Sequence, residues 1–82
     1  MTYDIRTLAQ RLAGQYRAKA ELALGFATEH AHTALDETMS DALCTEISAH
    51  AKAYAAEGMH CLRAARAADA GDTSPKPYTP AT

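Results

Sequence analysis

The sequence contains no valine and no tryptophan, and it has a single phenylalanine in 82 residues. Hydrophobic residues make up 48% of the chain, but 20 of them are alanine and only 13 are leucine, isoleucine, methionine or phenylalanine. Sheet cores need β-branched and aromatic side chains, so this composition argues against all-β and α/β domains. Because alanine has the highest helix propensity, we predict an all-α fold. A chain this short, with so few large apolar side chains, is marginal alone, which favours self-association or a partner.

Long hydrophobic runs are also absent. The longest, Leu22–Ala27, is far shorter than the roughly 20 residues of a membrane span, and the first residues do not have the pattern of a secretory signal. Cys44 and Cys61 have neither a Cys-x-x-Cys nor a zinc-site spacing. On one helix they would lie about 25 Å apart, too far for a disulfide. We therefore expect reduced thiols, a cytoplasmic location and no membrane association.

Apolar residues in the first part of the chain recur at steps of three and four, which is typical of one helix face. This first face comprises Ile5, Leu8, Leu12, Tyr16, Ala20, Ala23, Ala27, Ala31 and Ala34. It predicts a helix over about residues 4–32. Gly14 and Gly25 lie inside this range, where each costs up to about 1 kcal/mol relative to alanine. Two interpretations are open: a break near Gly14, or close packing of the glycine on a neighbouring helix.

A second apolar face follows the same spacing and predicts a helix over about residues 36–70. It comprises Met39, Leu43, Ile47, His50, Tyr54, Gly58, Cys61, Ala65 and Ala68. Two capping-box spacings precede it, Thr33 with Asp36 and Thr38 with Asp41. Gly71 follows the second face as the residue just past the helix end. A tight turn near 33–36 would make residues 1–71 an antiparallel hairpin.

Residues 72–82 contain all three prolines of the chain. Proline excludes helix and favours an extended conformation, so we predict an extended proline-rich tail. Tyr78 lies within it and has no helix to pack in. It is our candidate for a peptide-like anchor on a partner.

Charge is distributed unevenly, although the net charge is only −2. Residues 21–51 carry six acidic side chains and no lysine or arginine, whereas residues 1–20 carry four basic and one acidic. Folding as a hairpin would bring the acidic residues to the turn and the basic ones to the open end. We name Asp36, Glu37, Asp41 and Glu46 the acidic tip and take them as candidate partner-binding residues.

Two hypotheses account for this layout. Two hairpins could pair antiparallel into a four-helix bundle, each acidic tip beside the other's basic end. The candidate self-association residues are then those of the second face: Leu43, Ile47, His50, Tyr54 and Cys61. Alternatively, the acidic tip docks on a basic partner, where charge complementarity speeds association and sets register.

Little in the sequence indicates catalysis or a cofactor. Glu57 and His60 form a Glu-x-x-His pair of the kind used with further carboxylates in di-iron bundles, and Glu29 could add one in a dimer. The pair occurs once, so we expect no metal. Residues 7–22 resemble a helix-turn-helix only faintly, with Gln15 where an apolar residue belongs, and we expect no nucleic-acid binding.

These features predict a small, noncatalytic helical protein that binds another protein and forms a homodimer. In size and composition, though not in motifs, the chain is similar to small accessory proteins of phages and plasmids. Anti-CRISPR proteins are among these, so an inhibitor or regulator of a host complex is our leading hypothesis. A structural subunit of a larger assembly is the alternative, followed by a DNA-binding regulator and a di-metal carboxylate protein.

Overall fold

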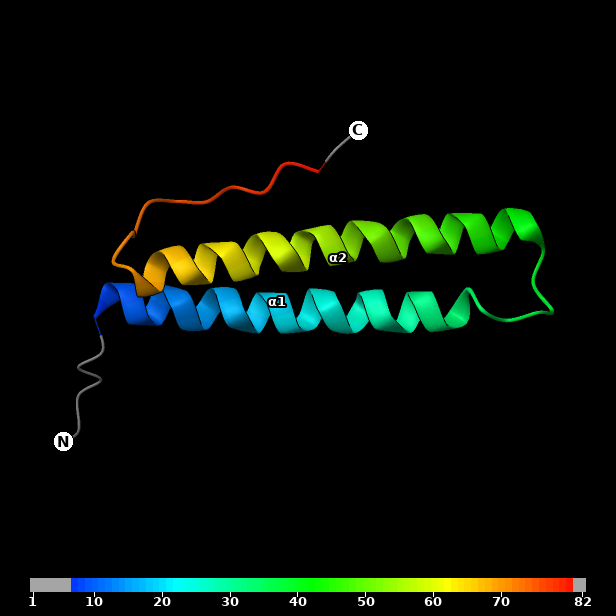
Figure 1. Cartoon of the computed structure of the whole chain (residues 1–82), viewed down its shortest axis with the longest axis horizontal. Coiled ribbons are helices and arrows are strands. Elements are labelled where there is room, and N and C mark those ends of the chain that lie inside the picture. The colour runs from blue at the N-terminus through cyan, green and yellow to red at the C-terminus, as the bar shows by residue number, and fades with distance from the viewer. Residues whose placement is uncertain (1–6, 81–82) are drawn as a thin grey trace.

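The computed structural model describes residues 7–80, which form two antiparallel helices and an extended tail (Figure 1). Helix α1 spans Leu8–Thr33 and helix α2 spans Asp41–Asp69. The prediction of an all-α fold built on a helical hairpin is confirmed for these residues. The predicted start of the first helix at residue 4 lies outside the described residues; α1 begins at Leu8.

A capping box fixes the start of α1 and was missed by the sequence analysis. The backbone N–H of Gln10 donates to Thr7 Oγ1 at 3.2 Å, and the Thr7 N–H donates to Gln10 Oε1 at 2.9 Å. This reciprocal pair satisfies backbone donors that a helix N-terminus otherwise leaves free. The helix then runs through Gly14 and Gly25 without interruption, so the predicted break is wrong. A Cβ at either glycine would meet no atom within 4 Å, so close packing does not explain them either.

The connection occupies residues 34–40, and α2 starts five residues later than predicted. Asp36 lies in the turn, where its Oδ1 accepts from the Thr38 N–H at 2.9 Å and from Thr38 Oγ1 at 2.7 Å. Ser40 caps α2 instead, since its Oγ accepts from the Leu43 N–H at 3.2 Å. Both predicted capping boxes are therefore wrong: Thr33 Oγ1 donates backward to Glu29 O at 2.9 Å within α1.

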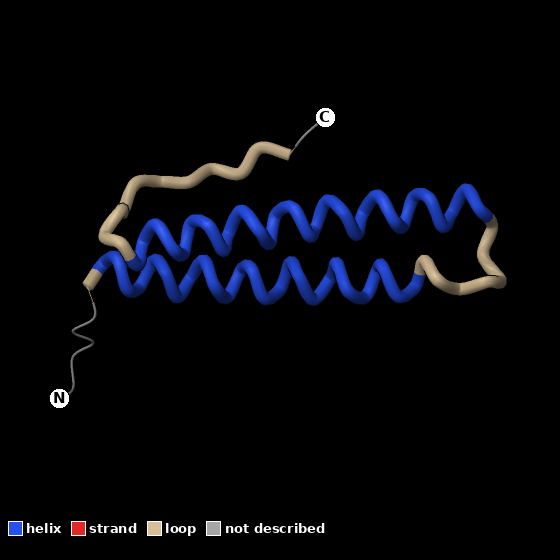
Figure 2. The backbone as a smooth tube through the Cα atoms, in the orientation of Figure 1, coloured by secondary structure: helices blue, strands red, loops and turns tan. Residues whose placement is uncertain are grey.

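Gly71 ends α2 as predicted, with a positive φ of 97°. The N–H of Gly71 donates to Ala68 O and that of Asp72 donates to Ala67 O, both at 2.9 Å. This is the Schellman arrangement, which needs a left-handed residue that glycine supplies without strain. It reverses the chain, so residues 72–80, which we call the tail, run back along α2 without helix or strand (Figure 2).

The buried contact between the helices, which we call the seam, is made of small residues. Its apolar members are Ala13, Ala20, Ala23, Ala27, Cys61, Ala64, Ala65 and Ala68, and Gly58 is also buried. A Cβ at Gly58 would lie 2.6 Å from Leu24 Cγ, so the helices approach closely there. Toward the connection they diverge (Figures 1 and 2). Among residues 7–80 no large side chain is fully buried, and Leu8 of the first face is 56% exposed.

The hairpin exposes more surface than its mass requires. Its accessible surface is 6208 Å², whereas a compact monomer of 8.7 kDa exposes about 4,700 Å². Its radius of gyration is 16.5 Å, against about 12 Å for a compact domain of this length. Several large apolar side chains are among the exposed residues: Leu8, Leu22, Phe26, Leu35, Leu43 and Met59.

Candidate interaction surfaces

The half of the hairpin near the connection, the loop-end half, has an open seam. All five buried residues of α2 lie between Gly58 and Ala68, and residues 41–57 contain none. Four of the five predicted self-association residues lie in this open stretch: Leu43, Ile47, His50 and Tyr54. Leu43 is 43% exposed, His50 is exposed, and Ile47 and Tyr54 are half-buried.

Cys61, the fifth predicted self-association residue, lies elsewhere. It is 6% exposed and belongs to the seam of its own hairpin. A role for Cys61 in contacts between chains, including an intermolecular disulfide, stays a prediction, and it would require the seam to open. The sequence placed it on the same helix face as Tyr54 but did not tell how closely α1 approaches at each level.

An aromatic cluster fills part of the open seam and consists of Phe26, His30, His50 and Tyr54. The Tyr54 ring centroid lies 5.4 Å from that of Phe26 and 5.1 Å from that of His30. His30 and His50 meet edge to face at 6.1 Å. His30 Nδ1 lies 2.8 Å from Phe26 O; a carbonyl only accepts, so Nδ1 carries the donated proton. The cluster remains accessible, with Phe26 46% exposed.

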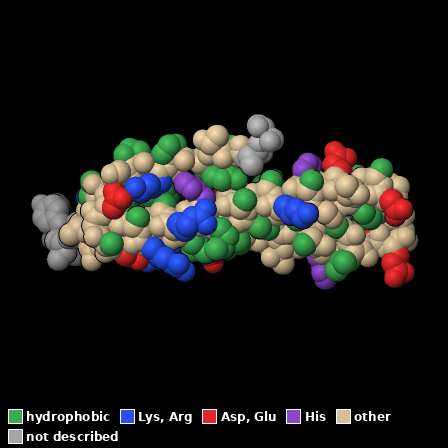
Figure 3. Space-filling model, turned by 45° about the horizontal axis from the view of Figure 1, so that its top comes forward, with side chains coloured by type: hydrophobic (Ala, Val, Ile, Leu, Met, Phe, Trp, Pro, Cys, Tyr) green, Lys and Arg blue, Asp and Glu red, His purple; other side chains and the backbone are tan. Residues whose placement is uncertain are grey.

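The acidic tip lies at the end of the hairpin, and all four of its residues are exposed. The hydroxyl of Thr38, followed by its backbone N–H, lowers the pKa of Asp36 by donating hydrogen bonds to its carboxylate. On the face drawn in Figure 3, acidic side chains and no basic ones gather at this end. The other half carries both signs: Arg11, Arg17, Lys19, Arg63 and Arg66 lie there with Glu21, Glu57 and Asp69. Along the 55 Å length, the loop end is thus acidic and the open end is mixed with an excess of basic residues.

At the open end, where α1 begins and α2 ends, the tail lies against α2 and forms one wall of a cleft whose other walls come from both helices. We define this tail groove by Tyr16, Lys19, Glu57, His60 and Cys61. Together with tail residues they line a cleft of about 400 Å³. His60 Nε2 donates to Lys76 O at 2.9 Å, and the Tyr78 ring lies 5.2 Å from the His60 ring. The candidate anchor Tyr78 therefore lies against its own chain in this structure.

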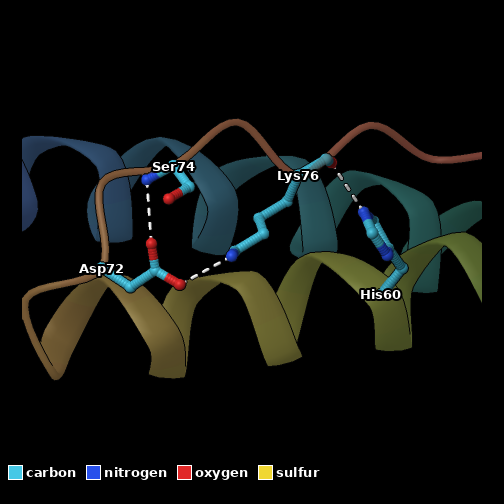
Figure 4. Close-up of polar contacts among 4 residues, drawn as sticks. All are labelled: His60, Asp72, Ser74 and Lys76. Carbon is cyan, nitrogen blue, oxygen red and sulfur yellow. Dashed lines mark hydrogen bonds and ion pairs between the residues drawn. The ribbon is translucent and has the colours of Figure 1, made fainter.

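A second set of contacts shapes the tail itself (Figure 4). Asp72 Oδ1 accepts from the Ser74 N–H at 2.9 Å, and Lys76 Nζ donates to Asp72 Oδ2 at 2.6 Å. Lys76, and then the Ser74 N–H, hold the pKa of Asp72 well below its usual value, because both bind the ionised carboxylate. This clasp was not predicted from the sequence, although Asp-x-Ser-x-Lys after a helix-ending glycine contains the required turn chemistry.

One member of the pair considered for a metal already has a hydrogen-bond partner. Glu57 and His60 both line the tail groove, but His60 Nε2 is engaged by the tail carbonyl. Glu29, the further carboxylate, lies on α1 near the connection and is exposed. Within residues 7–80, no three His, Cys, Asp or Glu side chains come together as a metal site would need.

In the part of the chain that the structure describes, neither helix is apolar enough over a sufficient length to cross a bilayer. Comparison with protein-family models, curated proteins and solved structures gives no match.

Proposed function

We propose that the chain is a noncatalytic protein-binding hairpin that completes its packing on another polypeptide. The observation that supports this best is the open seam, since residues 41–57 bury no side chain while carrying Leu43, Ile47 and Tyr54. An interface over the loop-end half would cover these side chains.

The partner that fits best is a second copy. Antiparallel pairing about a two-fold axis uses the same surface on both chains, and it would place each acidic tip beside the basic open end of the other. Opposite potentials then match along both halves of the interface. Four helices would enclose the open seams in a bundle.

Analytical ultracentrifugation from 1 to 100 μM tests this pairing. We expect a dimer whose dissociation constant rises at least tenfold in Leu43→Ser/Ile47→Ser, because two apolar side chains would leave the interface. Leu22→Ser is the matched control, since Leu22 lies on α1 outside the open seam and is 65% exposed; it should leave the constant unchanged. A wild-type monomer at 100 μM would contradict the proposal, and long polymers would favour a structural subunit instead.

Charge reversal tests the antiparallel arrangement separately. The variant Asp36→Lys/Glu37→Lys/Asp41→Lys and the variant Arg11→Glu/Arg63→Glu/Arg66→Glu should each dimerise poorly, because like charges then face each other. Mixed in equal amounts, they should recover a heterodimer. Failure of the mixture to associate better than either variant alone would argue against the tip-to-base arrangement.

A second candidate function is inhibition of a target that has a basic groove, by docking of the acidic tip. The exposure of all four tip residues favours it. The purified target captured from a host lysate should lose at least tenfold in affinity for the triple tip reversal, and a DNA duplex should compete. Glu21→Lys/Glu57→Lys/Asp69→Lys, an equal charge change outside the tip, should bind normally. Equal binding of both variants would remove the tip from this function.

We also propose a reducing compartment, the cytoplasm, because Cys44 and Cys61 are both free thiols. Under native conditions a thiol reagent should modify half-buried Cys44 faster than buried Cys61. Equal rates would mean that the seam opens readily.

A further inference from the structure

We infer that the tail groove is a binding site for an extended, proline-containing peptide segment of another polypeptide, and that the chain's own tail occupies it until such a segment displaces it. The inference concerns the open-end half of the hairpin and does not depend on the pairing proposed above. The occupant has a defined chemistry. It contains two prolines separated by one residue, and an aromatic residue directly follows the second proline, as in Pro75-Lys76-Pro77-Tyr78.

The burial pattern of the tail and its contacts with His60 indicate which features of a peptide the tail groove would recognise. Lys76 and Tyr78 are half-buried, while Pro75, Pro77 and Thr79 are exposed. This alternation is that of an extended segment with every second residue facing the helices. The Tyr78 ring lies against His60 at 5.2 Å, and the carbonyl of Lys76 accepts from His60 Nε2 at 2.9 Å.

His60 is therefore the central recognition residue, since it contributes both the hydrogen bond and the ring contact. Its hydrogen bond is made to a backbone carbonyl, which any peptide has. The bond therefore fixes the register of the peptide and does not select a sequence. Preference comes from the aromatic ring packed on the imidazole and from the extended shape. A helical segment could not present its carbonyls to His60, because those groups are used within the helix.

Proline reduces the conformational entropy that this kind of segment loses when it binds. Each proline fixes its own φ, and Ser74, Lys76 and Thr79 each precede a proline and are thereby restricted to extended conformations. Little conformational entropy remains to be lost on docking, which favours proline-rich ligands on shallow grooves.

The tail is held loosely enough to be displaced. Among the described residues, one hydrogen bond joins residues 73–80 to the helices, that of His60 with Lys76. The ion pair of Asp72 with Lys76 joins two residues of the tail, so it does not attach the tail to the helices. What keeps the tail in place is its covalent connection, which gives a short linker an effective concentration in the millimolar range. A free peptide of the same affinity therefore competes poorly until the tail is weakened.

The test uses a fluorescein-labelled synthetic peptide with the sequence of residues 72–82 and measures anisotropy against the full chain. Tyr78→Ala in the protein weakens its own tail, so it should bind the probe at least tenfold more tightly than wild type. Thr79→Ala is the matched control, because Thr79 is exposed, and it should behave as wild type. Adding His60→Ala to Tyr78→Ala should reduce probe binding at least tenfold, and a probe lacking the tyrosine should not bind.

Several results would overturn the inference: equal probe binding by wild type and Tyr78→Ala, no binding to Tyr78→Ala at millimolar probe, or binding that survives His60→Ala. Circular dichroism checks that each variant is helical. If His60→Ala unfolds, His60→Gln replaces it, since its amide still donates, and should retain part of the binding. A wild-type dimer that Tyr78→Ala abolishes would make a second copy's tail the occupant and overturn the assignment to another polypeptide. A monomeric wild type would contradict the proposed pairing while leaving this site intact.

Discussion

The two halves of the hairpin differ in the size of the side chains at the contact between α1 and α2. At the open end, Ala20, Gly58 and Ala68 bring the backbones together and are buried. At the loop end, where the helices diverge (Figure 1), the rings of Phe26 and Tyr54 contact each other, and both remain accessible. The open end is also covered by the tail, whereas the loop end has no further cover among residues 7–80.

The small-residue seam and the open seam contribute differently to helix pairing and to the burial of apolar area. Alanine and glycine bury little area each, but they let the helices contact along their backbones and so fix the pairing of the hairpin. Large side chains in the open seam bring more apolar area, yet two helices alone cannot enclose it. The open-end half therefore determines the fold, and the loop-end half is where another chain would contribute most stability.

The largest effect is expected from enlarging the small-residue seam. Ala68 is 0% exposed, so Ala68→Leu would force the helices apart and should destabilise the fold by about 3 kcal/mol. Thermal unfolding followed by circular dichroism, at one fixed protein concentration, measures this. Ala56→Leu places the same side chain on an exposed position of α2 and should change stability by less than about 0.5 kcal/mol. Equal effects would mean that the seam is not tightly packed.

A smaller effect separates the glycine in the seam from those outside it. In Gly58→Ala the new Cβ would lie 2.6 Å from Leu24 Cγ, and the strain should outweigh the gain in helix propensity, for a net loss of about 1 kcal/mol. Gly25→Ala meets nothing within 4 Å and should gain up to about 1 kcal/mol. Urea unfolding of both variants gives the comparison. A gain in both would show that Leu24 moves aside easily.

The same contrast explains how much of the fold followed from the sequence. Steps of three and four predicted both helices, because the period is a local property of the chain. The period cannot tell how deeply a face is buried, and so Leu8 and Leu43 were placed on contact faces although they are largely exposed. Only the positions of small residues such as Gly58 determine where two helices touch.

The start of α2 and the candidate sites were harder to predict, for other reasons. Asp36, Thr38 and Ser40 are all capping residues, and choosing among them depends on the turn that Asp36 forms with Thr38. The acidic tip could be located because charge is read directly from the sequence. The tail groove could not, because His60 and Lys76 meet across sixteen residues and no local pattern encodes that contact.

Acid should open the Asp72 clasp within the tail without unfolding the hairpin. The pKa of Asp72 lies below its usual 3.8 because Lys76 and the Ser74 N–H bind the ionised form. The ordered clasp thus binds fewer protons than a free tail; its contribution is complete above about pH 4 and is lost as the pH falls further, through the lowered pKa. The NMR signal of the Ser74 N–H, which donates to Asp72, should stay constant from pH 7 to about pH 4.5 and move toward its free-peptide position below it. Asp72→Asn should show loosened signals already at pH 7.

The smallest effect concerns the exposed ion pair of Arg17 with Asp69, whose side chains are 53% and 46% exposed. Such pairs contribute about 0.5 kcal/mol or less. Asp69 is the last residue of α2, where the helix dipole disfavours a carboxylate. Asp69→Asn removes the pair and this unfavourable charge together and should be close to neutral, whereas Arg17→Gln leaves the carboxylate uncompensated and should cost slightly more. A double-mutant cycle by urea unfolding, at low and at 1 M salt, measures the coupling. A coupling above about 1 kcal/mol that persists in salt would mean that this pair, and not only the small-residue seam, holds the open end together.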